Sequence, residues 1–295
     1  MNKYVLTCGS TTDLDASYLE QRNIYIIPFH YFVAEKEYID DFGKTLSYKD
    51  FYDAMRSGAM TKTRQVNVEE FKEFFKKFLD KGLDVIHVTL SSGLSGTYNS
   101  ARMAKEELEN KYPNQKIVII DSLGASSGYG MLMDTLADYR DMNYSIDDIV
   151  KVAEDIKLHL NHVFFSTDLT FYVRGGRVSK TAGFIGNLFK ICPLLDMNDE
   201  GKLIPRKKIR GKKHAISEMI DTMEDKANSG RNYHCKCFIS HSDCYKDALE
   251  VKKLAEARFP CLKDKIKIFN IGTTIGSHSG PGTVAIFFYG KERTR

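Results

Sequence analysis

The first 160 residues alternate short apolar runs with longer stretches of helical period. The apolar runs are typical of strands and occupy residues 3–8, 23–33, 83–90 and 116–121. Pro28 lies within the second run and indicates an edge position or a bend, because proline donates no hydrogen bond to a sheet. Strands that alternate with polar loops and helices in this way predict a mainly parallel sheet.

Three of the amphipathic stretches begin at residue pairs that favour a helix start. In each pair a side chain is expected to accept a hydrogen bond from the backbone three residues later. The pairs are Ser47 with Asp50, Asn67 with Glu70, and Ser145 with Asp148. Apolar residues in the second of these helices recur at helical spacing as far as Gly82, and we interpret them as core residues.

The pattern changes near residue 161. Most later strand-like runs have no crossover helix between them, which predicts a mixed sheet. Two examples are the runs at 192–197 and 202–209, on either side of the turn sequence NDEG. The chain has 295 residues, more than a typical single-core domain. We therefore predict an α/β fold of two domains. An N-terminal α/β domain (1–161) holds the mainly parallel sheet, and a C-terminal α+β domain (162–295) holds the mixed sheet.

Charge and composition exclude several classes of protein. Lys and Arg number 43 against 39 Asp and Glu, a net charge of +4 that is too small to predict a nucleic-acid partner. No apolar run reaches the roughly 18 residues of a membrane span, and the first residues are too polar for a secretory signal. We expect a soluble, cytoplasmic protein.

The cysteines suggest neither disulfides nor a metal site. The chain has six, a sparse count that favours free thiols. Cys235, Cys237 and His241 lie close together in the sequence, but the C-x-C spacing differs from the C-x-x-C of common zinc sites. We interpret Cys235 and Cys237 as buried residues on one face of a strand, and we expect no metal and no cofactor.

Candidate chemistry gathers in the sequence LSSGLSGTYNSA at residues 90–101, between a strand and a helix. Backbone N–H groups at such a helix start favour an anion, Ser95 and Thr97 add hydroxyl donors, and Gly96 permits close approach. A mononucleotide P-loop lacks its Gly-Lys-Ser/Thr, and a Rossmann site lacks its first glycine. A serine hydrolase that uses Ser95 and His278 stays open, although the nucleophile elbow requires G-x-S-x-G.

Three further segments supply candidate residues. Thr63 precedes the Asn67 helix in the sequence TKTRQVN, and Arg177 belongs to YVRGGRVS at 172–179. His278 is expected within a turn formed by Gly280, Pro281 and Gly282. Loops of this kind often carry functional groups on a fixed scaffold.

These motifs, GSTTDL, TRQ, SSGLSGTYNSA, RGGRVS and IGSHSGPGT, resemble in order and spacing those of the DegV family, the fatty-acid-binding proteins that serve bacterial fatty acid kinase. The resemblance implies two α/β domains with a long-chain fatty acid buried between them. It also implies that the protein has no catalysis of its own and presents the acyl carboxylate to a separate kinase, which makes acyl phosphate.

The resemblance also implies which residues hold the ligand. Thr63 and Ser95 match the family's carboxylate contacts, with Gly96 and Thr97 in the same loop, His278 nearby, and Arg177 near the same end. The chain departs from the family pattern at two places. Gly9 replaces an aspartate, and Arg64 with Val66 replaces the usual serine and proline around Gln65.

A basic stretch bears on partners. Residues 202–213 contain seven basic residues and no acidic one. One interpretation is the solvated side of a strand and helix start, which is the usual meaning of a charge run. The other is a docking face, centred on Arg206, Lys207 and Lys208, for the acidic surface of the kinase, for an anionic membrane that is contacted transiently, or for a phosphate.

Overall fold

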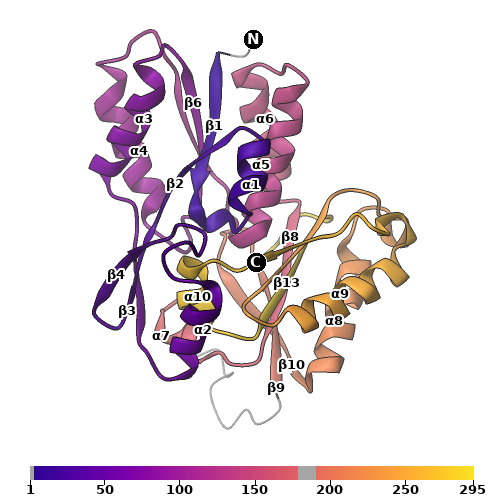
Figure 1. The fold of residues 1–295 in the computed structure, drawn as a ribbon. Coiled ribbons are helices and arrows are strands. Elements are labelled where there is room, and N and C mark those ends of the chain that lie inside the picture. The colour runs from indigo at the N-terminus through magenta and orange to yellow at the C-terminus, as the bar shows by residue number, and fades with distance from the viewer. Residues whose placement is uncertain (1–2, 179–190) are drawn as a thin grey trace.

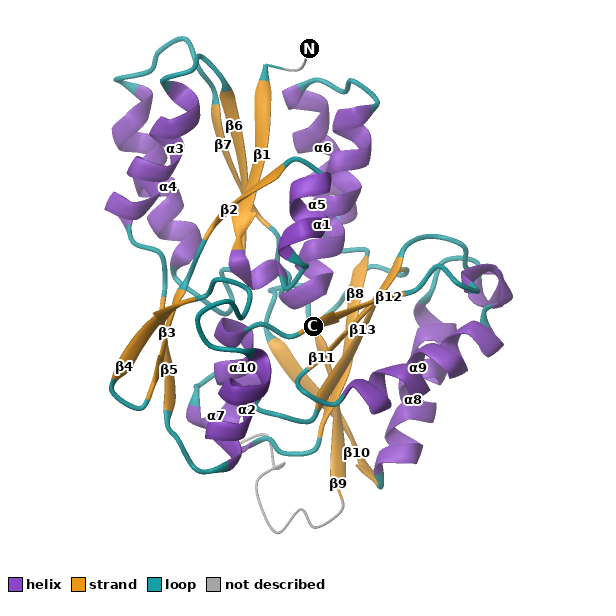
Figure 2. Cartoon of the chain, in the orientation of Figure 1, coloured by secondary structure: helices purple, strands orange, loops and turns teal. Residues whose placement is uncertain are grey.

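The computed structural model describes residues 3–178 and 191–295, which form three sheets with helices around and between them (Figure 1). The first sheet has four parallel strands in the order β2-β1-β6-β7. Helices α3 and α4 lie on one side of it, and α5 and α6 on the other (Figure 2). The bounds are Tyr4–Gly9 (β1), Ile24–Ile27 (β2), Asp84–Thr89 (β6), Ile117–Asp121 (β7), Ala16–Gln21 (α1), Val68–Leu79 (α3), Thr97–Glu109 (α4), Ser126–Asp141 (α5) and Ile146–Ile156 (α6).

A small antiparallel sheet, β4-β3-β5, extends from the end of β2. The apolar run at 23–33 therefore forms two strands in different sheets, with Pro28 at the break between them. Proline could not supply a ladder hydrogen bond there, so the chain bends at Pro28, and β2 is also an edge strand of its sheet, as the sequence predicted. The bounds are His30–Val33 (β3), Lys36–Ile39 (β4), Thr61–Arg64 (β5) and Tyr48–Arg56 (α2).

The third sheet is mixed and has six strands in the order β10-β9-β8-β13-β11-β12. Only β11 and β12 pair in parallel; the other pairs are antiparallel. Helices α8 and α9 pack on one face of this sheet. The bounds are Leu160–Ser166 (β8), Ile191–Met197 (β9), Leu203–Arg210 (β10), Cys237–His241 (β11), Lys267–Asn270 (β12), Thr283–Tyr289 (β13), Thr170–Arg174 (α7), Lys212–Lys226 (α8), Tyr245–Arg258 (α9) and Thr273–Ser279 (α10), with 3-10 turns at Ser10–Thr12, Gly230–Asn232 and Pro260–Leu262.

The local signals of the sequence correspond closely to the structure. Ser47, Asn67 and Ser145 are helix N-caps that each accept the predicted backbone hydrogen bond, and Asn67 with Glu70 forms a full capping box. The apolar stripe of α3 is buried against β6, as its spacing predicts. The predicted fold class, an α/β chain with one parallel and one mixed sheet, is confirmed.

Helix α5 connects the two larger sheets. It contacts β1 of the parallel sheet and β8, β11 and β13 of the mixed sheet, and its first nine residues are all buried. A helix that is buried all round needs small and apolar residues on every face, which agrees with the sequence SSGYGMLM at its start. This helix places the loops at the end of the parallel sheet directly against the mixed sheet.

Helix α10 comes from the C-terminal part of the chain but packs against α2, β3 and β5. Two buried carboxylates fix its start. Asp13 accepts from the backbone N–H of Gly272 at 3.0 Å, and Asp40 accepts from the hydroxyls of Thr273 and Thr274 at 2.9 and 2.7 Å. Burial raises the pKa of both Asp13 and Asp40. Residues far apart in the sequence thus share one polar cluster.

One interpretation of the cysteines was wrong. Cys237 is buried on β11, but Cys235 lies before the strand and is exposed. The strand begins only at Cys237, two residues after Cys235, so the two residues do not share a strand face. No described helix is long and apolar enough to cross a membrane.

Candidate functional site

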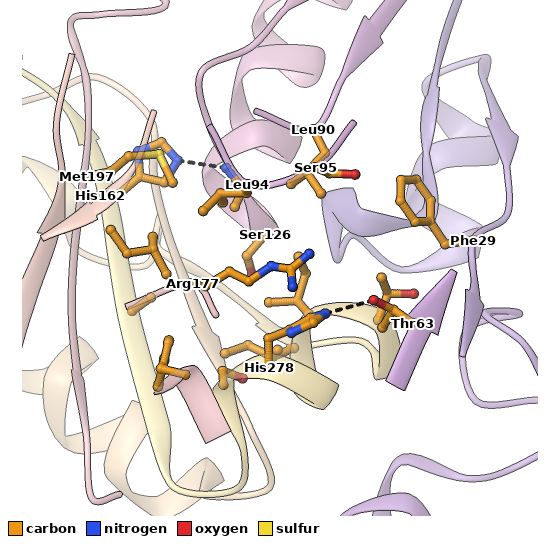
Figure 3. A pocket seen from close by; sticks show the side chains of 18 of the residues that line it. Phe29, Thr63, Leu90, Leu94, Ser95, Ser126, His162, Arg177, Met197 and His278 are labelled. Carbon is orange, nitrogen blue, oxygen red and sulfur yellow. Dashed lines mark hydrogen bonds between the residues drawn. The ribbon is translucent and has the colours of Figure 1, made fainter. Parts of the chain in front are cut away.

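A cavity of about 640 Å³ lies where the parallel sheet, α10 and the mixed sheet meet (Figure 3). This volume is typical of a small-molecule site. Most of its wall is apolar and comes from both large sheets and their loops. The apolar wall residues are Phe29, Leu90, Leu94, Ala125, Ile271 and Ile275 on one side, and Phe164, Met197, Leu203, Ala285 and Phe287 on the other.

The loop between β6 and α4 forms one polar edge of the cavity. Asp121, at the end of β7, accepts hydrogen bonds from the backbone N–H of Ser92 at 3.1 Å and of Leu123 at 3.0 Å, so one carboxylate holds two neighbouring loops. Ser95 lines the cavity, and its Oγ accepts from the N–H of Thr97 at 3.2 Å. The N-terminus of α4, a helix of 13 residues, therefore lies beside the Ser95 hydroxyl and adds a positive dipole end.

Thr63 and His278 form the adjacent part of the polar edge. The Oγ1 of Thr63 lies 2.8 Å from Nε2 of His278, and Figure 3 shows both at the same end of the cavity. Burial, and then the charge of Arg177, lower the pKa of His278 to about 3, so the imidazole is neutral near neutral pH. A Cβ at Gly175 would lie 2.3 Å from Nδ1 of His278, so only glycine leaves room for the ring.

His278 does not lie in the predicted turn. It belongs to the last turn of α10, and the residues from Gly280 to Gly282 follow the helix. The sequence pattern did not predict this helix, because the helix has only seven residues and contains glycine and serine, which do not favour helices. The correction matters because a helix orients His278 more firmly than a turn would.

Arg177 lines the cavity and has no acidic partner among the described residues. Its Nη1 donates to the carbonyl oxygen of Gly175, and no carboxylate in residues 3–178 or 191–295 forms an ion pair with it. Burial lowers the pKa of Arg177. A half-buried cation with no counter-ion is unfavourable unless an anion binds beside it. Ser179, which ends the RGGRVS motif, lies outside the described residues.

The structure thus brings five of the six predicted site residues to the cavity wall: Thr63, Ser95, Gly96, Arg177 and His278. The sixth, Thr97, is buried as the first residue of α4 and is not part of that wall. Its Oγ1 has no hydrogen-bond partner among the described residues.

The departures from the family pattern have structural explanations. A Cβ at Gly9 would lie 2.8 Å from the ring of Phe29, so the aspartate of the family pattern would have no room with Phe29 in this position. Arg64 lines the cavity, but Glu70 at 3.1 Å and Glu37 at 3.3 Å compensate its charge. Val66 is fully buried in the core.

Sequence reasoning missed His162 of β8, which also lines the cavity. Its Nε2 accepts from the N–H of Ala125 at 3.3 Å, and its Nδ1 lies 3.2 Å from the carbonyl oxygen of Leu160. Burial lowers the pKa of His162 far below its ordinary value, so it is neutral. Figure 3 shows His162 beside Met197, away from Thr63. A single histidine within an apolar strand carries no signal by which the sequence could identify it.

The arrangement does not match a serine hydrolase. Such an enzyme needs the nucleophile and the base within hydrogen-bond distance. Here His278 bonds to Thr63, and no hydrogen bond joins Ser95 to His278 in the part of the chain that the structure describes. The described residues also contain no cluster of side chains that could hold a metal ion.

The basic side chains of residues 202–213 are not part of the cavity wall, although Leu203 of the same stretch is. Most of them lie on β10, an edge strand of the mixed sheet, and the last two lie at the start of α8. Arg206 pairs with Asp196 at 2.7 Å, and Lys207 pairs with Glu218. Lys207, Lys208, Arg210 and His214 border an open hollow between β10 and the start of α8. The stretch is therefore partly compensated by internal acidic residues, and it leaves a shallow positive surface.

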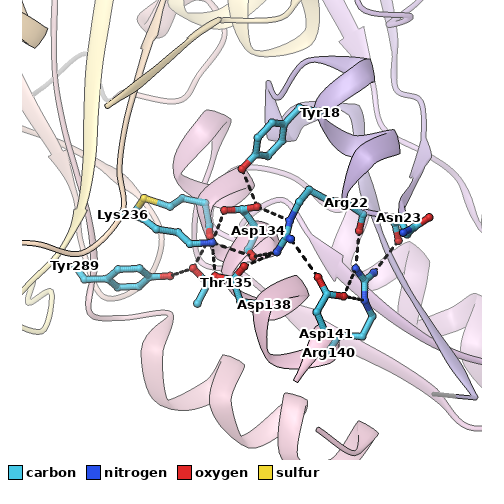
Figure 4. A network of polar contacts seen from close by, with 11 residues as sticks. Tyr18, Arg22, Asn23, Asp134, Thr135, Asp138, Arg140, Asp141, Lys236 and Tyr289 are labelled. Atoms are coloured by element: carbon cyan, nitrogen blue, oxygen red, sulfur yellow. Dashed lines mark hydrogen bonds and ion pairs between the residues drawn. The ribbon is translucent and has the colours of Figure 1, made fainter. Parts of the chain in front are cut away.

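A second polar cluster lies outside the cavity, at the contact between α1, α5 and the segment before β11 (Figure 4). Asp134 is its centre and is almost fully buried. It accepts from the hydroxyl of Tyr18 at 2.8 Å, pairs with Arg22 at 2.8 Å and also pairs with Lys236. Asp138 and Asp141 complete the network around Arg22. Each cation of this network has an acidic partner.

Comparisons with known proteins identify the family. A family model described as "Uncharacterised protein, DegV family" matches residues 3–291. A DegV domain-containing protein of Clostridium perfringens is 37% identical over 293 residues, which cover 99% of each chain. A DegV lipid binding protein of Thermotoga maritima is 28% identical, with both chains fully covered and a TM-score of 0.84. A second protein of Thermotoga maritima, whose structure is described as revealing a fatty acid binding function, is 26% identical, with 99% of this chain and 100% of that chain covered and a TM-score of 0.80. The chain belongs to the DegV family.

Proposed function

We propose that this DegV-family chain binds a long-chain fatty acid in the cavity, with its carboxylate beside Ser95, Thr63 and His278. The observation that carries the proposal is Arg177, a cation without an acidic partner among the described residues, which lines a cavity whose wall is otherwise mostly apolar. A fatty acid has the matching chemistry, one anionic end and a long apolar chain. The fatty-acid-binding relative of Thermotoga maritima supports the same ligand class.

The energetics favour such a ligand. Burying an acyl chain gains roughly 0.8 kcal/mol per methylene, so about 16 carbons supply more than 10 kcal/mol before the costs of association. Burying the carboxylate without partners would cancel much of this gain. Hydroxyl donors, the N-terminus of α4 and Arg177 offset that loss.

Native mass spectrometry of the purified protein tests the proposal. We expect a co-purifying fatty acid mass that is lost or strongly reduced in the double variant Ser95→Ala, Thr63→Ala. Thr97→Val is the matched control, because Thr97 belongs to the same loop but not to the cavity wall, and it should retain the ligand. Absence of any acyl mass would contradict the proposal. Labelling of Ser95 by a fluorophosphonate, with ester turnover that His278→Ala abolishes, would favour a hydrolase.

We further propose that the chain has no catalysis of its own and presents the carboxylate to a separate fatty acid kinase. The kinase would dock on the basic surface at Arg206, Lys207 and Lys208, because β10 is an edge strand and these three side chains are not part of the cavity wall. Reversal of these three residues to glutamate should leave fatty acid binding intact and slow acyl-phosphate formation by the added kinase.

A charge-matched control variant distinguishes the loss of a docking surface from a general effect of the changed net charge. The exposed residues Lys246, Lys253 and Lys263 lie on or after α9, and their reversal changes the total charge by the same amount. We expect normal rates for this control variant. Equal rates of acyl-phosphate formation for both triple variants would contradict the docking proposal. Weaker fatty acid binding by the variant at Arg206, Lys207 and Lys208 would contradict it as well.

A further inference from the structure

Four hydroxyl side chains gather at one side of the cavity, and the proposed function gives them no role. Ser166, Tyr172, Ser279 and Thr283, here called the hydroxyl cluster, are all buried. Tyr172, Ser279 and Thr283 line the cavity wall. Ser279 directly follows His278 in α10, so the cluster lies next to the polar edge where the carboxylate would bind.

Hydrogen bonds within the cluster have a fixed direction. Ser166 donates its proton to the carbonyl oxygen of Asp168 at 2.9 Å and therefore accepts from Thr283 at 3.0 Å. The one proton of Thr283 goes to Ser166 or to the carbonyl oxygen of Ser279 at 3.3 Å, and in either case the hydroxyl of Tyr172, 3.2 Å away, is the donor to Thr283. The phenol oxygen of Tyr172 is then left with free acceptor capacity.

Ser279 is the member without a partner. Its side chain is only 3% exposed, and its Oγ forms no hydrogen bond within the described residues. Burial raises the pKa of the Tyr172 phenol, and Ser279 lies close enough to oppose that rise, yet its Oγ forms no hydrogen bond of normal geometry with the phenol. A buried hydroxyl without a partner is unfavourable, so a bound polar group that pairs with Ser279 would stabilise the site.

We propose that the hydroxyl cluster binds a hydroxyl group on the acyl chain, close to its carboxyl end. Ser279 would donate to the oxygen of that hydroxyl group, and the phenol oxygen of Tyr172 would accept its proton. The substrate class is then a hydroxylated fatty acid. This inference rests on the proposed function, since it concerns a substituent of the same ligand in the same cavity.

The balance of energies makes the preference measurable. Burial of a hydroxyl group in an apolar tunnel without a partner is unfavourable, so a purely apolar cavity rejects hydroxylated chains. Two matched hydrogen bonds reverse that penalty and also satisfy Ser279. We expect roughly three- to tenfold enrichment of the hydroxylated acid over the plain acid.

A competition experiment tests the inference. The purified protein is equilibrated with equal amounts of hexadecanoic, 2-hydroxyhexadecanoic, 3-hydroxyhexadecanoic and 16-hydroxyhexadecanoic acids, and the bound acids are extracted and quantified by gas chromatography and mass spectrometry. The 2-hydroxy or 3-hydroxy acid should be enriched, and the 16-hydroxy acid depleted. Ser279→Ala should abolish the enrichment while hexadecanoic acid still binds. Tyr172→Phe, which removes the accepting oxygen, should reduce it as well.

Ser277→Ala is the matched control. Ser277 is a buried serine of the same helix, but its hydroxyl donates to the carbonyl oxygen of Thr273 and it is not part of the cavity wall. This variant should keep the wild-type ratio. Binding of hexadecanoic acid without enrichment of either hydroxylated isomer, or enrichment that Ser279→Ala leaves unchanged, would overturn the inference alone. Failure of all four acids to bind would instead overturn the proposed function.

Discussion

The network around Asp134 and the polar edge of the cavity are both charged regions within the molecule. They differ in whether each charged side chain has a partner of opposite charge among the described residues. In the network, Arg22 and Lys236 each pair with Asp134 and Asp138 (Figure 4). At the cavity, Arg177 has no described acidic partner and His278 is neutral. Charges that stabilise a fold are expected to be paired inside the protein, whereas a charge that serves a ligand is paired only when the ligand binds.

The largest change in stability should come from a substitution in the network around Asp134. Asp134→Asn keeps the shape of the side chain but leaves Arg22 and Lys236 with one acidic partner fewer at the centre of the network. We expect a loss of about 2 to 3 kcal/mol in the free energy of unfolding, measured with urea. The value lies at the low end for buried pairs because the side chains of Arg22 and Lys236 are 23% and 27% exposed. Asp141→Asn, at a carboxylate with 48% exposure, should cost less than about 0.5 kcal/mol. Equal losses in both variants would contradict the comparison.

His278 should cause a change of intermediate size in the free energy of unfolding as the pH is lowered. The folded protein holds the pKa of His278 at about 3, against an ordinary value of 6.5. Between these values the unfolded chain binds more protons, so stability falls as the pH falls below about 6.5. At about pH 5 the loss for this one group is about 2 kcal/mol.

Comparison with His278→Gln isolates this group, because the other buried histidines and the aspartates Asp13 and Asp40 are common to both proteins. The variant should lose about 2 kcal/mol less than the wild type between about pH 7 and about pH 5, by urea unfolding at each pH. Parallel pH profiles for the two proteins would mean that His278 is not held neutral in the folded state.

The smallest effect on stability, and a clear effect on binding, should come from Arg177. Arg177→Gln removes a cation that has no described acidic partner, so the free energy of unfolding of the ligand-free protein should not fall. Affinity for a fluorescent fatty acid should fall by about tenfold, the usual loss for a charge-assisted hydrogen bond. A large loss of stability without a loss of affinity would assign Arg177 to the fold instead of the ligand.

The sequence predicted local structure well and spatial proximity less well. The N-caps Ser47, Asn67 and Ser145 depend on neighbouring residues only, so pattern and chemistry were sufficient. The resemblance to a family identified five of the residues that line the cavity through specific motifs. Thr97 shared the motif but not the geometry, since the direction of a side chain at a helix start is not encoded in its spacing.

Other features depend on contacts between distant segments. The absence of an acidic partner at Arg177 can be known only once the surrounding elements are placed. His162 carried no signal because its Nε2 accepts from the N–H of Ala125, which lies 37 residues away in the sequence and which only the fold brings near. The sequence also could not predict that the hydroxyl of Ser279 has no partner among the described residues. Serine is common in all classes of structure, and its hydrogen bonds cannot be predicted from the residues next to it in the sequence.

The cluster of Asp13 and Asp40 with the start of α10 has a consequence for the order of synthesis. During translation the parallel sheet and its helices leave the ribosome long before Gly272, Thr273 and Thr274. Until those residues arrive, Asp13 and Asp40 lack the donors of α10 and have only earlier donors such as the hydroxyls of Ser126 and Ser10. The polar cluster is therefore completed only by residues made late in synthesis, after the strands and helices of the parallel sheet.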